Sequence, residues 1–393
     1  MILEPFEPLI YSGTIEDFIS PPLDAAKAGE ISRLLKKKHN VLHLIFGEER
    51  TNRLLDEWER DGILISSGKN ALIILEQRFK YLGTESSRIG VIGILNLDVD
   101  RHDLIPHERT IERFVDERKR IFKEIEAQIE PIFVTVVGSR LETVLRDTVS
   151  KESASFSFND SSNVLNIVYI IRETHRINDI LDALRRVKGI IADGHHRFKA
   201  LNEINEERVS AGLEKFPCYI YVTSFNSDSL KISGFHRIIK DHTNGNFLEA
   251  IDNYFTSIEV LEPKLKERIA IYDGKFRELN PLPLVEKLID RENSGRYVFT
   301  DFSDSIILSR IFSLDINRDQ DMINFTASYE EAIEQIDSGK ASLAILIPPW
   351  NKSSFMNLVE AGKLFSPKST FFFPKVYAGI AIMRMSSDRR NEY

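Results

Sequence analysis

Short apolar runs and helical patterns alternate along this chain. The apolar runs are mostly β-branched and bounded by Gly, Asn, Asp or Pro, a pattern that predicts strands. The predicted strands are Ala71–Leu75, Ile89–Leu97, Ile132–Val137, Val164–Ile171, Tyr219–Thr223, Val298–Thr300 and Ser342–Ile347. Because strands alternate with helices, the pattern indicates an α/β or α+β fold.

Two segments carry the periodicity of a helix with one buried face. Ile111–Ile129 has its apolar residues at helical spacing and stops before Pro131. Asn178–Val187 opens with an asparagine, a favoured N-cap residue. Both segments are therefore predicted to be amphipathic helices.

Two polar stretches indicate where the chain divides. A chain of 393 residues is long enough for two or three subdomains. Ser150–Asn163 is rich in Ser and Asn, and Asp241–Asn246 reads DHTNGN. We therefore expect an N-terminal α/β region at 1–150, a central phosphate-binding region at 151–240 and a C-terminal α/β region at 241–393, with both flanking regions adding to the central site.

Composition and charge exclude several classes of protein. The net charge of −8 argues against a general nucleic-acid binder, although a local basic pocket remains compatible with it. Cys218 is the single cysteine, which excludes an intrachain disulfide and a structural cysteine–zinc site. The start MILEPFEPLI lacks a cationic region, and no apolar run approaches the ~18 residues of a membrane helix. We expect a cytoplasmic protein without a membrane partner; the sequence does not indicate its oligomeric state.

The stretch GIIADGHHRFKA, from Gly189 to Ala200, gathers polar groups where a strand meets a helix. Asp193-Gly194 makes the turn, and Arg197–Glu207 has a helical pattern. A helix start attracts phosphate, and His195, His196 and Arg197 add donors there. The turn lacks the pattern of a Walker loop. We interpret it as a phosphate site; the alternative is a capped helix whose polar residues are merely solvated. As a polar residue at a helix start, Arg197 is expected to contribute little to folding.

A second polar cluster is IPHERTI, from Ile105 to Ile111. Glu108 is a candidate base or magnesium ligand, while His107, Arg109 and Thr110 are candidate phosphate contacts. The alternative is a capping segment for the helix that follows.

Weaker signals come from four further places. His236-Arg237 repeats the His-Arg dipeptide, and Asp24 lies on a Pro-rich turn. All three are candidate substrate-pocket residues; the alternatives are a chance surface dipeptide and a purely structural turn. Glu76 follows an apolar run, an unusual place for a carboxylate. Cations and hydroxyls surround the aromatic run Phe371–Phe373, namely Lys368, Ser369, Thr370 and Lys375. They form either the wall of a substrate pocket that takes an anion or an edge strand with solvated lysines.

These motifs, in this order, carry a resemblance across almost the whole chain. They are SPPLD at Ser20–Asp24, LEQRF at Leu75–Phe79, PHERT at Pro106–Thr110, ADGHHRF at Ala192–Phe198, FHR at Phe235–Arg237 and PKSTFFFPK at Pro367–Lys375. The chain resembles the uncharacterised bacterial and archaeal domain-of-unknown-function family 1015. The DGHHR turn alone is similar to the phosphate-binding turn of the ParB/sulfiredoxin superfamily, which includes archaeal free-serine kinases.

The second resemblance implies a ParB/sulfiredoxin-like central region and a kinase that phosphorylates a small hydroxyl substrate, with serine as the first candidate. ADP or ATP would be the phosphoryl donor. Gly194–Arg197 would hold its phosphates, and Mg²⁺ would lie between the phosphates and Asp193. Glu108 or Glu76 would take the hydroxyl proton, while Lys368 and Arg109 neutralise charge.

Two alternatives to a kinase stay open at this point. In a phosphohydrolase, His195 or His196 would be the general acid and water the acceptor. A nucleotide or phosphometabolite sensor would bind its ligand without turnover. In each case we expect Asp193–Arg197, His107–Thr110 and Lys368–Thr370 to converge on one cleft.

Overall fold

The computed structural model describes residues 1–385 except 23–25, 27–28, 47–50, 67, 82, 98–103, 242–246, 266–267, 284, 286–297 and 320. The chain forms two compact units. Unit 1 comprises Met1–Pro106, Glu112–Lys231 and the segment from Pro374 onward, and unit 2 comprises His107–Ile111 and Ile232–Phe373. Unit 2 is thus an insertion in the sequence of unit 1.

Unit 1 is built on one mixed sheet. Its strand order is β6 (Leu104–Ile105), β11 (Gly189–Asp193), β8 (Ile132–Val136), β12 (Cys218–Ser224), β5 (Thr84–Leu95), β4 (Leu72–Tyr81), β10 (Leu165–Ile171) and β9 (Phe156–Asn159), with β1 (Leu3–Glu4) also paired to β5. β6 runs parallel to β11, and β8 runs parallel to β12, while the other pairs are antiparallel. Every residue of β8 and β12 is buried, as expected of central strands covered on both faces.

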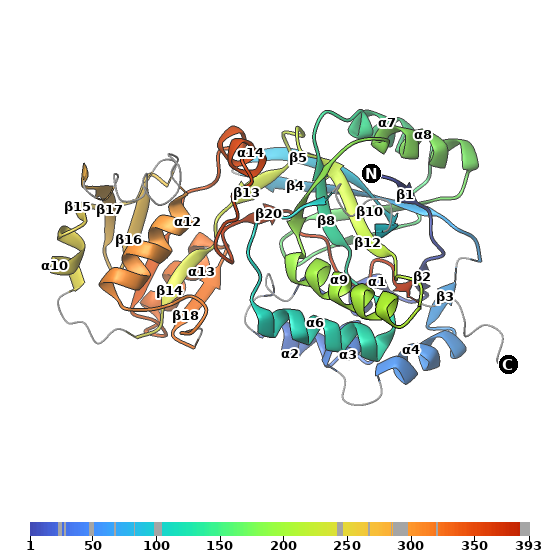
Figure 1. The fold of residues 1–393 in the computed structure, drawn as a ribbon, viewed down its shortest axis with the longest axis horizontal. Helices are drawn as coiled ribbons and strands as arrows, with labels where there is room; N and C mark the ends of the chain where they lie inside the picture. Colours follow the sequence, from blue (N-terminus) through green and yellow to red (C-terminus); the bar gives the residue numbers. More distant parts are fainter. Residues whose placement is uncertain are drawn as a thin grey trace. The chain divides into compact units, whose positions relative to one another are not determined.

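The helices of unit 1 include two that lie side by side, α6 (Glu112–Ile125) and α9 (His195–Ser210) (Figure 1). Lys119 of α6 bonds to Glu203 of α9 at 3.0 Å, so ion pairs join their exposed edges. The other helices are α1 (Ile15–Phe18), α2 (Glu30–Leu34), α3 (Leu42–Phe46), α4 (Thr51–Arg60), α7 (Leu141–Val149) and α8 (Thr174–Leu184). Two short strand pairs complete the unit: β2 (Leu9–Tyr11) with β3 (Leu64–Ser66), and β7 (Ala127–Gln128) with β21 (Met383–Arg384).

Unit 2 has an antiparallel sheet of its own. The strand order is β15 (Phe255–Val260), β17 (Phe276–Pro281), β16 (Ile269–Tyr272), β19 (Leu343–Leu346), β14 (His236–Ile239) and β18 (Ile323–Thr326). Its core includes Ile271, Ile307 and Ile345. The helices are α10 (Phe247–Asp252), α12 (Phe299–Phe302), the π-helix η1 (Ser303–Ile311), α13 (Tyr329–Asp337) and α14 (Lys352–Glu360). β13 (Lys231–Ser233) pairs with β20 (Phe371–Phe373) as a separate ribbon.

Most of the predicted elements are confirmed. Strands form at all the predicted places except Val298–Thr300, and the helices α6, α8 and α9 form where helical periodicity was predicted. At Val298–Thr300 the prediction is wrong, because Val298 is the residue before α12 and the apolar residues that follow have helical spacing. The mixed sheet confirms an α/β protein; a ParB/sulfiredoxin-like central region stays a prediction.

The predicted division of the chain differs from the observed one. A boundary at residue 150 would cut the sheet of unit 1, because β9 and β10 pair with each other and β10 pairs with β4. The serine-rich stretch is only the connection that leads into these strands. The long segment of unit 2 begins at Ile232, ahead of the predicted boundary at 241, and the chain returns to unit 1 at Pro374. None of the described helices has both the length and the apolar character needed to cross a bilayer.

Candidate functional site

The DGHHR turn lies between β11 and α9, as the sequence predicts. Gly194 has a φ of 91°, a left-handed conformation that glycine adopts without strain. A Cβ atom at this position would also lie 3.2 Å from the Arg197 guanidinium. The turn therefore requires glycine for both its backbone conformation and the approach of Arg197.

Four charged residues gather at this turn, and we call them the Asp193 cluster: Asp193, Arg197, Lys375 and Glu130. Arg197 Nη2 donates to Asp193 Oδ2 at 2.8 Å, and Lys375 Nζ donates to Asp193 Oδ1. Arg197 Nη1 lies 3.2 Å from Glu130 Oε2 and donates to the carbonyl of Pro131 at 2.9 Å. The cluster thus joins the turn to the end of the loop before β8 and to the segment after β20.

Arg197 is not a solvated residue, which was the alternative interpretation of the turn. Only 8% of Arg197 is exposed, and its guanidinium bridges Asp193 and Glu130. Removing it would leave two largely buried carboxylates with less compensating charge. The expectation that Arg197 contributes little to folding is therefore wrong.

Asp193, the predicted magnesium ligand, already has charged partners in the structure. Both of its carboxylate oxygens already contact cations, Arg197 on one side and Lys375 on the other. Among the described residues, no group of three His, Cys, Asp or Glu side chains is placed to hold a metal. Mg²⁺ at Asp193 stays a prediction, and Lys375 is a second cation at the same carboxylate.

The two histidines of the turn have different environments. His195 is buried, and burial lowers its pKa to about 3, an effect that neighbouring His196, Lys375 and Arg197 reinforce and Asp193 opposes. His195 is therefore neutral near pH 7 and does not add a positive charge to the turn. His196 is half-buried, and its ring meets Phe114 of α6 edge to face, with centroids 5.5 Å apart.

The depressed pKa of His195 makes stability depend on pH. Between about pH 6.5 and pH 3 the unfolded chain binds a proton that the folded chain does not, so the free energy of unfolding falls as pH falls through this window. The loss is about 1.4 kcal/mol for each pKa unit. His195→Asn should flatten the pH profile of urea unfolding, whereas His175→Asn, at an exposed site, should not. An unchanged profile for His195→Asn would contradict this assignment.

Glu76 does not face the Asp193 cluster. Its carboxylate accepts hydrogen bonds from Arg78 at 3.0 Å and Ser87 at 2.9 Å. Gln77, the next residue of β4, donates to the carbonyl of Lys375 at 2.9 Å. Successive side chains of a strand point to opposite faces, so Glu76 lies on the other face of the sheet from Gln77. This placement argues against Glu76 as the base beside the DGHHR turn.

Sequence analysis did not identify two residues that lie near the Asp193 cluster, Gln77 and Arg88. They lie directly opposite each other on β4 and β5, and both are fully buried. Arg88 Nη2 donates to Gln77 Oε1 and to the carbonyl of Pro374. The two side chains therefore hold the backbone of Pro374 and Lys375. A glutamine inside LEQRF and an arginine at the head of an apolar strand were the signals available.

In unit 2, PHERT and PKST meet around Glu108. The backbone N–H groups of Lys368 and Thr370 donate to the Glu108 carboxylate at 2.7 and 3.1 Å, and the Thr370 hydroxyl donates to it at 2.8 Å. Lys368 has a φ of 59°, a strained conformation for a residue with a side chain, which these bonds help to hold. Burial raises the pKa of Glu108, although the bonds from Thr370 and Lys368 oppose that shift.

His107 is enclosed in this unit rather than presented to a ligand. It is fully buried, with its Nε2 atom 2.8 Å from the Thr370 hydroxyl. Because that hydroxyl donates its proton to Glu108, His107 Nε2 is the donor to Thr370. The ring lies among three phenylalanines, with centroid distances of 5.0, 5.7 and 5.9 Å: Phe355, Phe365 and Phe372. These contacts favour a structural role for His107, and its contact with phosphate stays a prediction.

The His236-Arg237 dipeptide is also internal. His236 Nδ1 accepts a hydrogen bond from the N–H of Ile347 at 3.0 Å, and burial lowers the pKa of His236 to about 4. Arg237 donates to both oxygens of Asp304 at 2.8 and 3.0 Å and to the carbonyl of Lys368 at 3.2 Å. These contacts fix β14 and the PKST loop, and a place for His236 and Arg237 in a substrate pocket stays a prediction.

The remaining predicted residues vary in exposure. Arg109 is exposed, and its backbone N–H donates to the carbonyl of Phe365 at 3.0 Å. Thr110 is half-buried. Ser369 is fully buried, and its carbonyl accepts a hydrogen bond from Trp350 Nε1 at 2.9 Å. Asp24 lies outside the described residues.

The predicted site residues thus form two clusters, one in each unit. Asp193, Arg197 and Lys375 meet in unit 1, whereas PHERT and Lys368–Thr370 meet in unit 2. Within unit 2, the PHERT and PKST segments are in contact through Glu108, although they lie far apart in the sequence. Convergence of the two clusters on one cleft stays a prediction.

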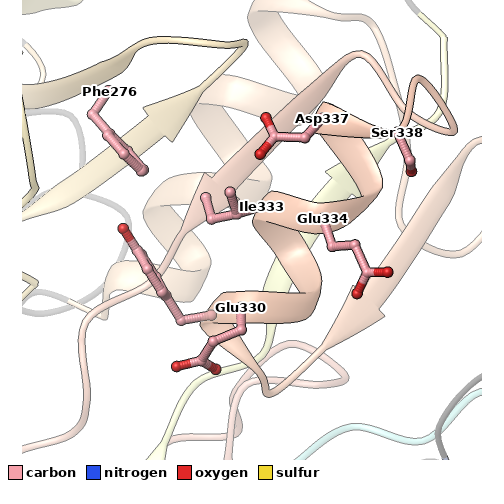
Figure 2. Close-up of a pocket in the computed structure, with 7 residues that line it drawn as sticks. Phe276, Glu330, Ile333, Glu334, Asp337 and Ser338 are labelled. Atoms are coloured by element: carbon pink, nitrogen blue, oxygen red, sulfur yellow. The ribbon is translucent and has the colours of Figure 1, made fainter.

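A separate hollow of about 600 Å³ lies on unit 2 and contains none of the predicted residues. Figure 2 shows the carboxylates of Glu330, Glu334 and Asp337 extending from one helix, with Phe276 opposite. The lining holds acidic groups and no Lys or Arg. Negative charge of this kind repels phosphate, so this hollow is not the expected nucleotide site.

The fold and the Asp193 cluster define an α/β protein with a mixed sheet and a charged strand-to-helix turn that carries arginine and lysine. The sequence profile described as "Protein of unknown function (DUF1015)" matches residues 3–297, and the chain belongs to this family.

Comparison with individual proteins gives one similar sequence and several solved structures of low similarity. An ATP-dependent L-serine kinase from Staphylothermus marinus is 23% identical over 184 residues, or 47% of this chain. The chain spans 66% of that kinase's length, slightly under two thirds. A conserved hypothetical protein from Pyrococcus furiosus aligns with 73% of this chain and 92% of its own, at 14% identity and a TM-score of 0.40. A free serine kinase variant in complex with ADP aligns with 72% of this chain and 87% of its own, at 15% identity and a TM-score of 0.40.

Proposed function

We propose that this protein is a nucleotide-dependent kinase that phosphorylates the hydroxyl group of a small metabolite, with free serine as the first candidate. The observation that carries the proposal is the turn at the start of α9, where Arg197 and Lys375 lie around Asp193. The sequence similarity to an L-serine kinase supports the same class of reaction.

The turn suits a phosphate group for two physical reasons. The start of the 16-residue helix α9 is the positive end of its dipole, which favours an anion. Arg197 and Lys375 place N–H donors at the same end, where they are paired with Asp193 and Glu130. Gly194 lets the backbone approach a ligand closely. His195 is neutral near pH 7, so its part would be hydrogen bonding rather than charge.

In the proposed reaction, the acceptor hydroxyl oxygen forms a bond to the terminal phosphorus of ATP or ADP. The bond from that phosphorus to its bridging oxygen breaks, and the hydroxyl proton passes to a carboxylate. Glu108 is our candidate for that carboxylate, because burial raises its pKa toward the range of a useful base. Positioning and charge stabilisation are the main sources of rate in such reactions.

The test is a product assay. Purified full-length protein is incubated with ATP or ADP, with and without added Mg²⁺, and a panel of hydroxyl metabolites that includes serine. We expect a phosphorylated metabolite, detected by mass spectrometry. Asp193→Asn should reduce its formation, whereas Asp147→Asn, at an exposed site on α7, should not.

The other outcomes of this assay decide between the alternatives. Release of free phosphate in the absence of any acceptor would indicate a phosphohydrolase rather than a kinase. Tight nucleotide binding without any product would replace it by a sensor. Absence of both binding and product would reject the proposal.

A further inference from the structure

Arg88 is the buried cation of unit 1 for which the described residues supply no carboxylate partner. None of its surface is exposed. Its Nη2 atom donates to Gln77 Oε1 and to the carbonyl of Pro374, which are both neutral acceptors. Arg197, the other buried arginine of this unit, contacts two carboxylates instead.

The remaining surroundings of the Arg88 guanidinium are aromatic. Its central carbon lies 4.7 Å from the centroid of Phe133 and 5.5 Å from that of Tyr221. These rings stabilise a cation. The Nε and Nη1 atoms, however, have no hydrogen-bond partner among the described residues. Two strong donors of a charged group are therefore left over inside the protein.

Such an arrangement is costly for a group with only a structural role. Burying an ion without an opposite charge costs several kcal/mol, and each unsatisfied donor adds to that cost. Burial lowers the pKa of Arg88, with the Tyr221 phenol opposing part of the shift. Arginine nevertheless stays protonated in proteins, so the charge persists. Residues that break the packing rules in this way are concentrated at functional sites.

Arg88 also lies beside the Asp193 cluster. It bonds to Pro374, and the next residue, Lys375, contacts Asp193. Phe133, whose ring covers the guanidinium, is paired in the sheet with Asp193. Together, Arg88, Lys375 and Arg197 carry three positive charges against the two negative charges of Asp193 and Glu130. The uncompensated charge is that of Arg88.

We infer that Arg88 binds an oxyanion, a phosphate or carboxylate group of a small ligand, next to the Asp193 cluster. The inference shares with the proposed function only the placing of a ligand in unit 1 and does not require phosphoryl transfer. Because the guanidinium is fully buried, side chains around it must move when the anion enters. The hydrogen bonds from Arg88 Nη2 to Gln77 and Pro374 would hold the guanidinium in place while Nε and Nη1 donate to the anion.

Arg88→Met tests the inference because it removes the charge and keeps similar volume. The probes are inorganic phosphate and ADP for a phosphate group, and acetate for a carboxylate group, each titrated calorimetrically against the full chain. Affinity for the probe that wild type binds should fall about 10- to 100-fold, the usual worth of charge-assisted hydrogen bonds. Without probe, the Tm should be unchanged or higher, since an unpaired buried charge has been removed.

Arg197→Met is the matched control, because it removes a buried arginine that is paired. It should lower the Tm without any probe.

Equal probe affinity in wild type and Arg88→Met would overturn the inference, as would a wild type that binds none of the probes. If Arg88→Met does not fold, Arg88→Lys is measured: a folded variant with weakened probe binding supports the inference, and wild-type affinity or failure to fold rejects it. If Arg88→Met weakens anion binding but the wild type forms no kinase product, the proposed function is rejected and this inference is supported.

Discussion

Replacing Arg197 with methionine is expected to lower the free energy of unfolding by about 3–5 kcal/mol, the cost of breaking a buried ion pair from one side. The reason is geometric. Arg197 contacts both Asp193 and Glu130, and it also bonds to the carbonyl of Pro131. Methionine fills the space but leaves Glu130 without that cation and Asp193 with Lys375 alone. Urea unfolding followed by circular dichroism measures the change.

Arg120→Met is the control for this substitution. Arg120 pairs with Glu124 one turn along α6, and more than half of its side chain is exposed. Exposed pairs of this kind contribute about 0.3–0.5 kcal/mol. If Arg197→Met cost no more than Arg120→Met, the Asp193 cluster would not hold the fold together in solution.

The second large effect is expected in catalysis. Glu108→Gln should reduce formation of the phosphorylated product by ~10²–10⁴-fold, the usual contribution of a general base. Its nucleotide affinity should change little, since the phosphate-binding role is assigned to the turn of unit 1. Initial rates and calorimetric affinities, measured on the same preparation, separate these two quantities.

Glu76→Gln is the matched variant, because Glu76 is the other glutamate that sequence reasoning placed in the role of base. Its carboxylate bonds to Arg78 and Ser87, so we expect its turnover to match wild type. Thermal melting must show that Glu108→Gln is folded, because the Glu108 carboxylate also accepts hydrogen bonds from the N–H groups of Lys368 and Thr370. A larger loss of turnover in Glu76→Gln than in Glu108→Gln would reverse the assignment.

Local sequence patterns were sufficient for the elements but not for the contacts. The DGHHR turn was predictable because a buried strand, a glycine and a helical pattern follow one another directly. The pairing of Asp193 with Lys375 was not, because 182 positions separate the two residues. Chain topology and sheet register create that contact, and neither can be read from the residues beside it.

Burial was the second quantity that the sequence did not reveal. His107 and Arg237 resemble ligand contacts in the sequence, since both are polar and lie beside other polar residues. The structure surrounds His107 with phenylalanine rings and Arg237 with Asp304 and backbone carbonyls. Strand alternation did contain a usable signal: if Glu76 points to one face, Gln77 must point to the other.

The insertion of unit 2 within the sequence of unit 1 has a consequence for biosynthesis. A ribosome produces Asp193 and Arg197 first, then the whole of Ile232–Phe373, and only afterwards Pro374 and Lys375. Domains commonly fold in the order of their synthesis. The main sheet of unit 1 is complete in sequence at Ser224, but the unit must still wait for its last segment, which begins at Pro374. Until then Gln77 and Arg88 lack the backbone that they hold, and Asp193 lacks its second cation. Unit 2 is thus free to finish folding first, although its sequence begins later.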